Sequence, residues 1–343
     1  GWLDNMEYYP GVQLEPGSEV WYIYLKISEK TSWWNNQSYV NTLDKHAIDR
    51  FIEVTHERYY EKFADSFGND MPAVFTDEPQ FAEKTYLNFP DERKVVTLPF
   101  TDDFPDTFRE KCGLDFFAVL PDLIWERKDH SGYSARYAYH NHLTDRFVEA
   151  YAGNIGAWCE THGICLAGHM KGEETLESQT KFVGDCMRSL SCFHLPGHDV
   201  LCDQRDYATA KMAQSIARQY GRYGALSELY GVTNWDFDFR GHKMQGDWQA
   251  AMGITVRVPH LTWMSMKGEA KRDYPASIGY QSPWYQKYRW IEDHFARVNT
   301  VLSRGRARVS IAVIHPIESY WLYFGVYEQT YQVRKELERY YRN

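Results

Sequence analysis

Short apolar runs alternate with amphipathic helical patterns along most of this sequence, and the alternation restricts the folds that are open to it. Between several of these runs, apolar side chains recur at helical spacing, as over residues 43–63, 136–161 and 284–303. Repeated strand–helix units predict parallel strands with helices packed against them. The candidate strands are residues 20–27, 72–78, 164–170, 198–203, 223–231, 254–263 and 309–316, with residues 2–9 as a weaker eighth.

Seven or eight such units predict an α/β fold of the (β/α)8 TIM-barrel type. An open doubly wound sheet is the alternative, but no GxGxxG motif follows any of the runs, which removes the main support for its dinucleotide-binding version. Residues 80–135 are too long for an ordinary loop, so we expect a long insertion after the third strand, at the catalytic face. We expect residues 1–325 to form the barrel, and residues 326–343 a C-terminal helix or the start of a flanking module.

The net charge of −9 and the scattered basic residues argue against a nucleic-acid partner and against an anionic membrane surface. No apolar stretch approaches the roughly 18 residues of a membrane span, and no signal peptide opens the chain. Localisation stays open between the bacterial cytoplasm and the periplasm. The six cysteines form no CxxC pair, which favours buried free thiols over a zinc or redox motif.

Aromatic residues make up 16% of the chain, with 12 Trp and 26 Tyr. Their rings offer flat apolar faces with a polar tip, which suit the apolar C–H faces and hydroxyl rims of sugars. A large core or a subunit interface would account for the same composition. Composition alone therefore permits a carbohydrate site without requiring one.

The stretch "AVFTDEPQF" at residues 73–81 carries an apolar run directly into two acids and a proline. Acids also end the later runs, in "GHMKGEE", "HDVLCD" and "SELYG", with histidines and aromatic residues beside them. In a (β/α)8 barrel the carboxyl ends of the strands meet at one mouth. The candidate site residues are Asp77, Glu78, His169, Glu173, Glu174, Asp199, Glu228, Tyr230, Trp235, His260 and Trp263.

Paired carboxylates among Trp and Tyr indicate glycoside hydrolysis. One carboxyl is protonated and donates to the leaving oxygen, while the other is ionised and attacks the sugar or activates water. Glu78 and Glu228 come from well-separated strands and could face each other with a water between them, which favours the inverting geometry of roughly 6.5–9.5 Å. Glu174 with Glu228 is the closer alternative and would suit the retaining geometry of about 5–5.5 Å.

Five stretches together resemble the catalytic barrel of the glycoside hydrolase family 106 α-L-rhamnosidases and their bacterial relatives. They are residues 40–81, from "VNTLDKHAIDRF" to "AVFTDEPQF", then "GICLAGHMKGEETLESQ", "HLPGHDVLCD", "ALSELYG", and "GITVRVPHLTWMSMKGEAKRDYPASI" with "QSPWY". The resemblance covers roughly residues 35–320. It implies an inverting enzyme with glutamates as general acid and general base, and with calcium near the site.

On the matching positions, Glu78 would be the acid and Glu228 the base. The pair Glu173 and Glu174 would supply a third carboxylate that binds the sugar or tunes a pKa. His169, Tyr230 and His260 would bind hydroxyl groups of the substrate. Asp77, Asp199, Trp235 and Trp263 would line the same site. Family members are longer, so we expect β-rich flanking modules to be missing from this chain.

The favoured interpretation is removal of a terminal sugar, α-L-rhamnose above all, from plant or microbial glycans or glycosides. Galactose, arabinose or a uronic acid would fit the same carboxylates. No cofactor is required, and a structural calcium stays an option. Two other interpretations remain: a metal-dependent hydrolase that uses His169, Glu174 and Asp199, and a non-catalytic carbohydrate-binding barrel.

Overall fold

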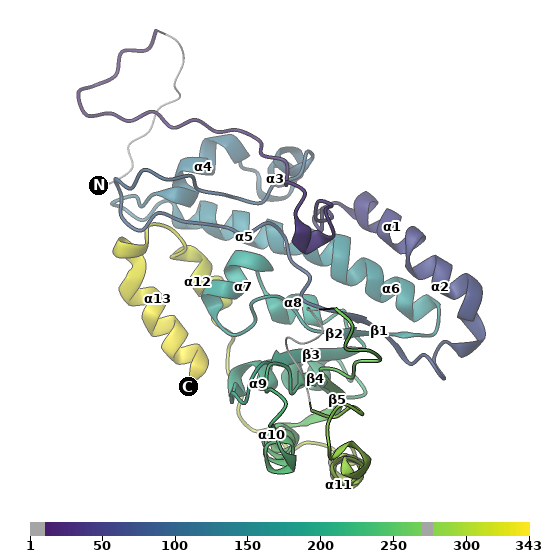
Figure 1. The fold of residues 1–343 in the computed structure, drawn as a ribbon. Helices are drawn as coiled ribbons and strands as arrows, with labels where there is room; N and C mark the ends of the chain where they lie inside the picture. The colour runs from purple at the N-terminus through teal and green to yellow at the C-terminus, as the bar shows by residue number, and fades with distance from the viewer. Residues whose placement is uncertain (1–10, 269–276) are drawn as a thin grey trace.

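The computed structural model describes residues 11–268 and 277–343 of the chain (Figure 1). Within them, five parallel strands form one sheet in the order β1-β2-β3-β4-β5. The strands are β1 Ala73–Thr76, β2 Cys165–Gly168, β3 Leu195–Val200, β4 Ala225–Leu229 and β5 Ile254–Pro259. Because each strand pairs with the next one along the chain, the right-handed crossovers place their helices on the same side, as in half of a barrel.

The predicted closed (β/α)8 barrel is wrong. The sheet is a half-barrel of five strands, and its edge strands β1 and β5 do not pair with each other. The predicted strands at residues 20–27 and 309–316 are irregular and exposed; Ile23, for example, is 68% exposed and Ile311 77%. An apolar run becomes a strand only when a neighbouring strand satisfies its N–H and C=O groups, and neither run pairs with the outer edge of β1 or of β5.

The other five predicted runs each overlap a strand, and residues 2–9 lie outside the described residues. β3 begins earlier than its predicted run, at Leu195. The pairing register sets Thr76 of β1 opposite Gly168 of β2, and Asp199 of β3 opposite Glu228 of β4. This register brings the acidic strand ends to one edge of the sheet.

Helices fill the connections between the strands. Their bounds are α1 Lys45–Val54, α2 His56–Phe63, α3 Phe104–Cys112, α4 Phe116–Ile124, α5 Tyr133–Phe147, α6 Gly153–Thr161, α7 Leu176–Phe182, α8 Cys186–Leu190, α9 Tyr207–Gln219, α10 Phe239–Met252, α11 Arg289–Leu302, α12 Ile317–Leu322 and α13 Tyr327–Arg342. A π-helical segment, Val148–Ala152, joins α5 to α6, so the helix predicted over residues 136–161 is continuous. The helix predicted over residues 43–63 is instead divided at Thr55.

The two faces of the sheet are distinguished by alternate side chains of β3. His198 lies against α9, with its Nδ1 atom 3.1 Å from Oγ1 of Thr209. Because successive side chains of a strand point to opposite faces, Asp199 points away from α9. Glu228, its partner in register on β4, points the same way. The helices therefore cover one face, and the acids belong to the other.

The predicted insertion, residues 80–135, is part of the main core. Phe104 of α3 and Phe116 of α4 pack against Tyr139 of α5, Phe108 of α3 stacks on Phe104, and all four are buried. Fully burying an aromatic side chain of this size stabilises a fold by roughly 1.5–3 kcal/mol. Residues 326–343 form α13 almost entirely, and α13 packs on α7 and α12 (Figure 1).

All six cysteines are free thiols. In the ranges that the structure describes, no helix is long and apolar enough to cross a membrane. The aromatic residues pair mainly with one another inside the core, as Phe147 and Tyr151 do with stacked rings at 5.7 Å. Much of the high aromatic content is therefore structural.

Candidate active site

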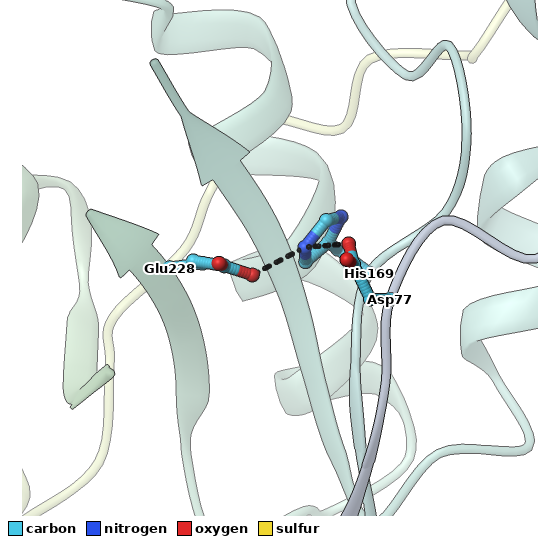
Figure 2. A group of neighbouring side chains, drawn as sticks. All are labelled: Asp77, His169 and Glu228. Carbon is cyan, nitrogen blue, oxygen red and sulfur yellow. Dashed lines mark hydrogen bonds and ion pairs between the residues drawn. The ribbon is translucent and has the colours of Figure 1, made fainter. Parts of the chain in front are cut away.

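Neighbouring strands place polar side chains at one edge of the sheet. Asp77 follows the last residue of β1, His169 follows the last residue of β2, and Asp199 and Glu228 lie near the ends of β3 and β4. Figure 2 shows Asp77, His169 and Glu228 pointing toward one another. The strand ends thus converge as the sequence predicts, although the sheet that carries them is open.

Gly168 is the residue that lets β1 and β2 approach each other just before Asp77 and His169. Its φ is 128°, a conformation that residues with side chains rarely adopt, and a Cβ atom there would stand 2.0 Å from the carbonyl oxygen of Thr76. The backbone N–H of His169 donates to the same carbonyl at 3.3 Å. This close approach fixes the backbone position from which the His169 side chain extends.

His169 links two of the acids. Its Nε2 atom lies 2.8 Å from Oε2 of Glu228 and 3.4 Å from Oδ1 of Asp77. Burial alone would lower the pKa of His169. The hydrogen bond to Glu228 and the nearby negative charges outweigh that effect and raise the pKa to about 9. At neutral pH the imidazole is therefore protonated and donates to Glu228.

Asp199 is an acid of this edge with a raised pKa. Burial raises its pKa, and the charge of His169 opposes the rise. The negative charges of Glu228, Glu78 and Asp77 add to it, and the pKa reaches about 7. Asp199 can therefore hold a proton near neutral pH, beside a Glu228 that accepts a hydrogen bond from an imidazolium.

Glu78 lies at the same edge but in a different setting. Its backbone has a φ of 47°, in the left-handed region that a non-glycine residue seldom occupies. Its Oε2 atom lies 2.8 Å from Nζ of Lys171, and both side chains are partly exposed. Sequence reasoning missed Lys171, because a lysine in a polar loop is normally solvated; its only signal was its place two residues after His169.

The structure distinguishes Glu173 from Glu174. Glu173 is buried, and its Oε1 atom accepts a hydrogen bond from the backbone N–H of Asp199 at 2.6 Å. Burial raises the pKa of Glu173 well above its usual value. Glu174 is exposed. Glu173 therefore supports β3 from within, while Glu174 is not brought together with Glu228.

Tyr230 is held inside the fold. It is fully buried, its hydroxyl donates to the carbonyl oxygen of His242 at 3.2 Å, and the same hydroxyl accepts from Arg257 at 2.8 Å. Burial raises the pKa of Tyr230 to about 12. Its side chain supports the β4–α10 connection, and the predicted hydrogen bond to a substrate has no free hydroxyl to make it.

His260 and Trp263 extend the edge beyond β5. Nε2 of His260 lies 3.9 Å from Oε1 of Glu228, and the rings of His260 and Trp263 meet edge to face at 6.4 Å. Trp263 is partly exposed, so an aromatic surface lies next to His260. Trp235, in the loop after β4, is also partly exposed.

Asp77, His169 and Glu228 form a candidate metal site, because one ligand atom from each lies within 4.8 Å of the others. Calcium takes six to eight oxygen ligands. This group offers one imidazole and two carboxylates, and Nε2 of the imidazole already donates to a carboxylate. The residues do not fit calcium. They also differ from the predicted metal set, since Glu174 is exposed.

A cavity of about 320 Å³ lies elsewhere, between α7 and α13. Glu177, Lys181 and Glu338 are among its lining residues, and none of the strand-end residues lines it. Nζ of Lys181 lies 3.1 Å from Oε1 of Glu177, so these charges are already paired. We place no chemistry in this cavity.

Comparison with known proteins gives a likeness of fold. No family model matches the sequence, and no curated protein matches it. The fold is similar to that of a rhamnosidase. This neighbour is the rhamnosidase from Novosphingobium sp. PP1Y, with a TM-score of 0.57 and 18% identity over 78% of this chain and 25% of that one. The chain thus spans about a quarter of its neighbour's length, and the likeness supports a rhamnosidase-like fold without an assignment to family 106.

Proposed function

We propose that this chain carries the active site of a glycoside hydrolase that removes a terminal sugar, with α-L-rhamnosides as the first substrates to test. The observation that carries the proposal is the hydrogen bond from His169 to Glu228, with Asp199 beside it in register. Glycoside hydrolysis needs one ionised and one protonated carboxyl at the same sugar. A pair of acids whose surroundings push their protonation apart meets that need.

Glu228 is the ionised member. We assign it this role because the protonated imidazole of His169 donates to its Oε2 atom at 2.8 Å. A carboxylate in this position either activates a water molecule or attacks the anomeric carbon directly. Because His169 occupies Oε2, the oxygen that would attack the sugar or activate water is Oε1, which lies 3.9 Å from Nε2 of His260.

The protonated member has two candidates. Glu78 is the donor that the resemblance to family 106 implies, and with Glu228 it would form the more widely separated, inverting pair. Oε2 of Glu78 already accepts a hydrogen bond from Nζ of Lys171 at 2.8 Å. Asp199, with a pKa of about 7, can hold a proton near neutral pH. Because neighbouring strands lie about 4.8 Å apart, Asp199 with Glu228 suits the retaining geometry instead.

The residues around Glu228 and its acid partner would bind the sugar. Asp77 is the exposed partner of His169 and can accept hydrogen bonds from hydroxyl groups. His260 and Trp263 offer a ring edge and a partly exposed aromatic surface on the other side of Glu228. The type of sugar depends on the spacing of such groups. The rhamnosidase-like fold makes α-L-rhamnose the first choice.

The test is a panel of aryl glycosides that includes α-L-rhamnoside, α- and β-galactoside, α-L-arabinoside and glucuronide, with proton NMR of the first-formed anomer. Hydrolysis of one of them supports the proposal, and the anomer identifies the donor. An inverted product favours Glu78, and a retained product favours Asp199. Binding of the glycosides without hydrolysis of any would contradict the proposal and favour the carbohydrate-binding interpretation.

A further inference from the structure

The C-terminal helix α13 touches the segment that follows β2 with three side chains of one face. Arg334, Glu338 and Tyr341 are spaced by four and three residues, which places them on one side of a helix. All three contact residues 173–177, which begin four positions after His169, and Figure 1 shows α13 beside α7. The helix therefore reaches the back of the candidate site.

Arg334 and Glu338 dock the helix. Arg334 is buried, its Nε atom donates to the hydroxyl of Tyr320 at 2.9 Å, and its guanidinium lies 3.1 Å from Glu177. The carboxylate of Glu338 accepts from the backbone N–H groups of Leu176 and Glu177, at 3.2 and 2.8 Å. These N–H groups open α7 and have no partner within their own helix. The contacts of Arg334 and Glu338 that dock the helix are therefore separate from those of Tyr341.

Tyr341 makes a different contact. Its hydroxyl donates to the carbonyl oxygen of Glu173 at 3.0 Å, and Nε2 of Gln179 donates to the same carbonyl at 3.0 Å. Nε2 of Gln179 also lies 3.1 Å from the Tyr341 hydroxyl, so the three groups close a triangle of hydrogen bonds. The backbone of Glu173 is consequently held from two sides.

The side chain of Glu173 connects this fixed backbone to β3. Its Oε1 atom lies 2.6 Å from the backbone nitrogen of Asp199, and the residue is only 2% exposed. A sugar cannot reach a carboxylate that is buried in this way. Asp199 in turn lies opposite Glu228 in the β3–β4 register. An unbroken line of contacts therefore runs from α13 to the two acids.

We propose that Tyr341 and Glu173 are positioning residues that hold Asp199 at a fixed separation from Glu228. The inference rests on the proposed glycosidase function, and it replaces the expectation that Glu173 binds sugar. A reaction that depends on two carboxyls tolerates little change in their separation, since a displacement of about 1 Å can cost up to about 100-fold in rate. The C-terminal helix then helps to fix the geometry of the active site.

The first experiment compares Tyr341→Phe with Tyr340→Phe on the best-hydrolysed aryl glycoside. Tyr340 is adjacent and 53% exposed, so it controls for the loss of a tyrosine hydroxyl on α13. For Tyr341→Phe we expect kcat to fall about 10-fold with KM within about twofold, and the control to match the wild type. Arg334 and Glu338 keep the helix docked, so a purely structural role would lower thermal stability and leave kcat of the folded enzyme unchanged.

The second experiment needs no substrate. Hydrogen exchange at the Asp199 amide, followed by NMR on deuterated protein, reports the hydrogen bond to Glu173 directly. Glu173→Leu removes the acceptor, and exchange should be about 10-fold faster or more. Glu173→Gln keeps an acceptor oxygen and should restore most of the protection. Tyr341→Phe should give an intermediate rate, and Tyr340→Phe the wild-type rate.

The two experiments test separate claims. If the wild type hydrolyses no glycoside, the proposed function fails, while the exchange rates still decide whether α13 is coupled to Asp199. Equal exchange at Asp199 in the wild type, Glu173→Leu and Tyr341→Phe would overturn the coupling, and so would a Tyr341→Phe enzyme with wild-type kcat. Faster exchange in Tyr341→Phe, together with a lower kcat and an unchanged KM, supports it.

Discussion

Oε2 of Glu228 lies 2.8 Å from Nε2 of His169, although the two residues come from β4 and from the end of β2, with β3 between them. Gly197 of β3 lies between these strands. A Cβ atom at Gly197 would stand 2.6 Å from the carbonyl oxygen of Gly168 and 2.8 Å from Cδ2 of Leu226. The glycine therefore lets β3 pack closely between β2 and β4.

Asp199 should make stability depend on pH between about 4 and 7. Its pKa is about 7 in the fold against 3.8 as a free side chain, so in this range the folded state holds a proton that the unfolded state has released. The stabilisation from that proton is fully present below pH 4 and is lost as the pH rises through 7, at up to about 1.4 kcal/mol per pH unit. Asp199→Asn should make this slope shallower and leave the part that comes from Glu173, whose pKa burial also raises.

The measurement for Asp199 is the free energy of unfolding in urea at several pH values from 4.5 to 7.5. Asp203→Asn, which alters an exposed acid four residues away, should keep the wild-type slope. An Asp199→Asn protein whose stability changes with pH as steeply as the wild type would show that Asp199 is ionised throughout.

Gly168→Ala should be among the most destabilising single substitutions in the sheet. The new Cβ atom would meet the carbonyl oxygen of Thr76 at 2.0 Å, so β1 and β2 must separate. Gly113→Ala is the matched control, because Gly113 also has a positive φ, of 69°, but open space around the new atom. We expect a loss of about 1–2 kcal/mol for the control and about 4 kcal/mol or more for Gly168→Ala in urea unfolding. Similar losses would mean that the close approach is not rigid.

Chelation distinguishes the glycosidase from the metal-dependent hydrolase. Because His169 donates to Glu228 through the atom that a metal would need, we expect hydrolysis to continue unchanged after dialysis against EDTA, with no gain from added calcium, zinc or manganese. A complete loss of activity that a divalent ion restores would mean that Asp77, His169 and Glu228 bind a metal, contrary to the hydrogen-bonded arrangement described here.

The sequence predicts the acids near the strand ends, because an apolar run with an acid at its end indicates both the strand and the side chain at its carboxyl end. β1 with Asp77 and β4 with Glu228 illustrate this. It does not predict strand pairing. Residues 20–27 and 309–316 have the same apolar character as the five strands, but pairing depends on which segments the fold brings alongside a sheet edge.

The details of the site depend on contacts that no local pattern contains. Glu173 and Glu174 are equivalent in the sequence, and only the position of Asp199 makes the first a buried acceptor. Tyr230 resembles a sugar ligand until Arg257 and the carbonyl of His242 occupy its hydroxyl. The contribution of α13 has no sequence signal at all, since Tyr341 reaches Glu173 over 168 positions of the chain.

The role of Glu228 is tested most directly by Glu228→Gln, measured as kcat/KM on the hydrolysed glycoside together with the melting temperature. The amide keeps an oxygen for His169 but can neither attack carbon nor activate water, so kcat/KM should fall by roughly 10²–10⁴-fold while the melting temperature shifts by only a few degrees. Glu61→Gln, on the exposed surface of α2, should leave both unchanged. A Glu228→Gln enzyme that keeps the wild-type kcat/KM would contradict the account.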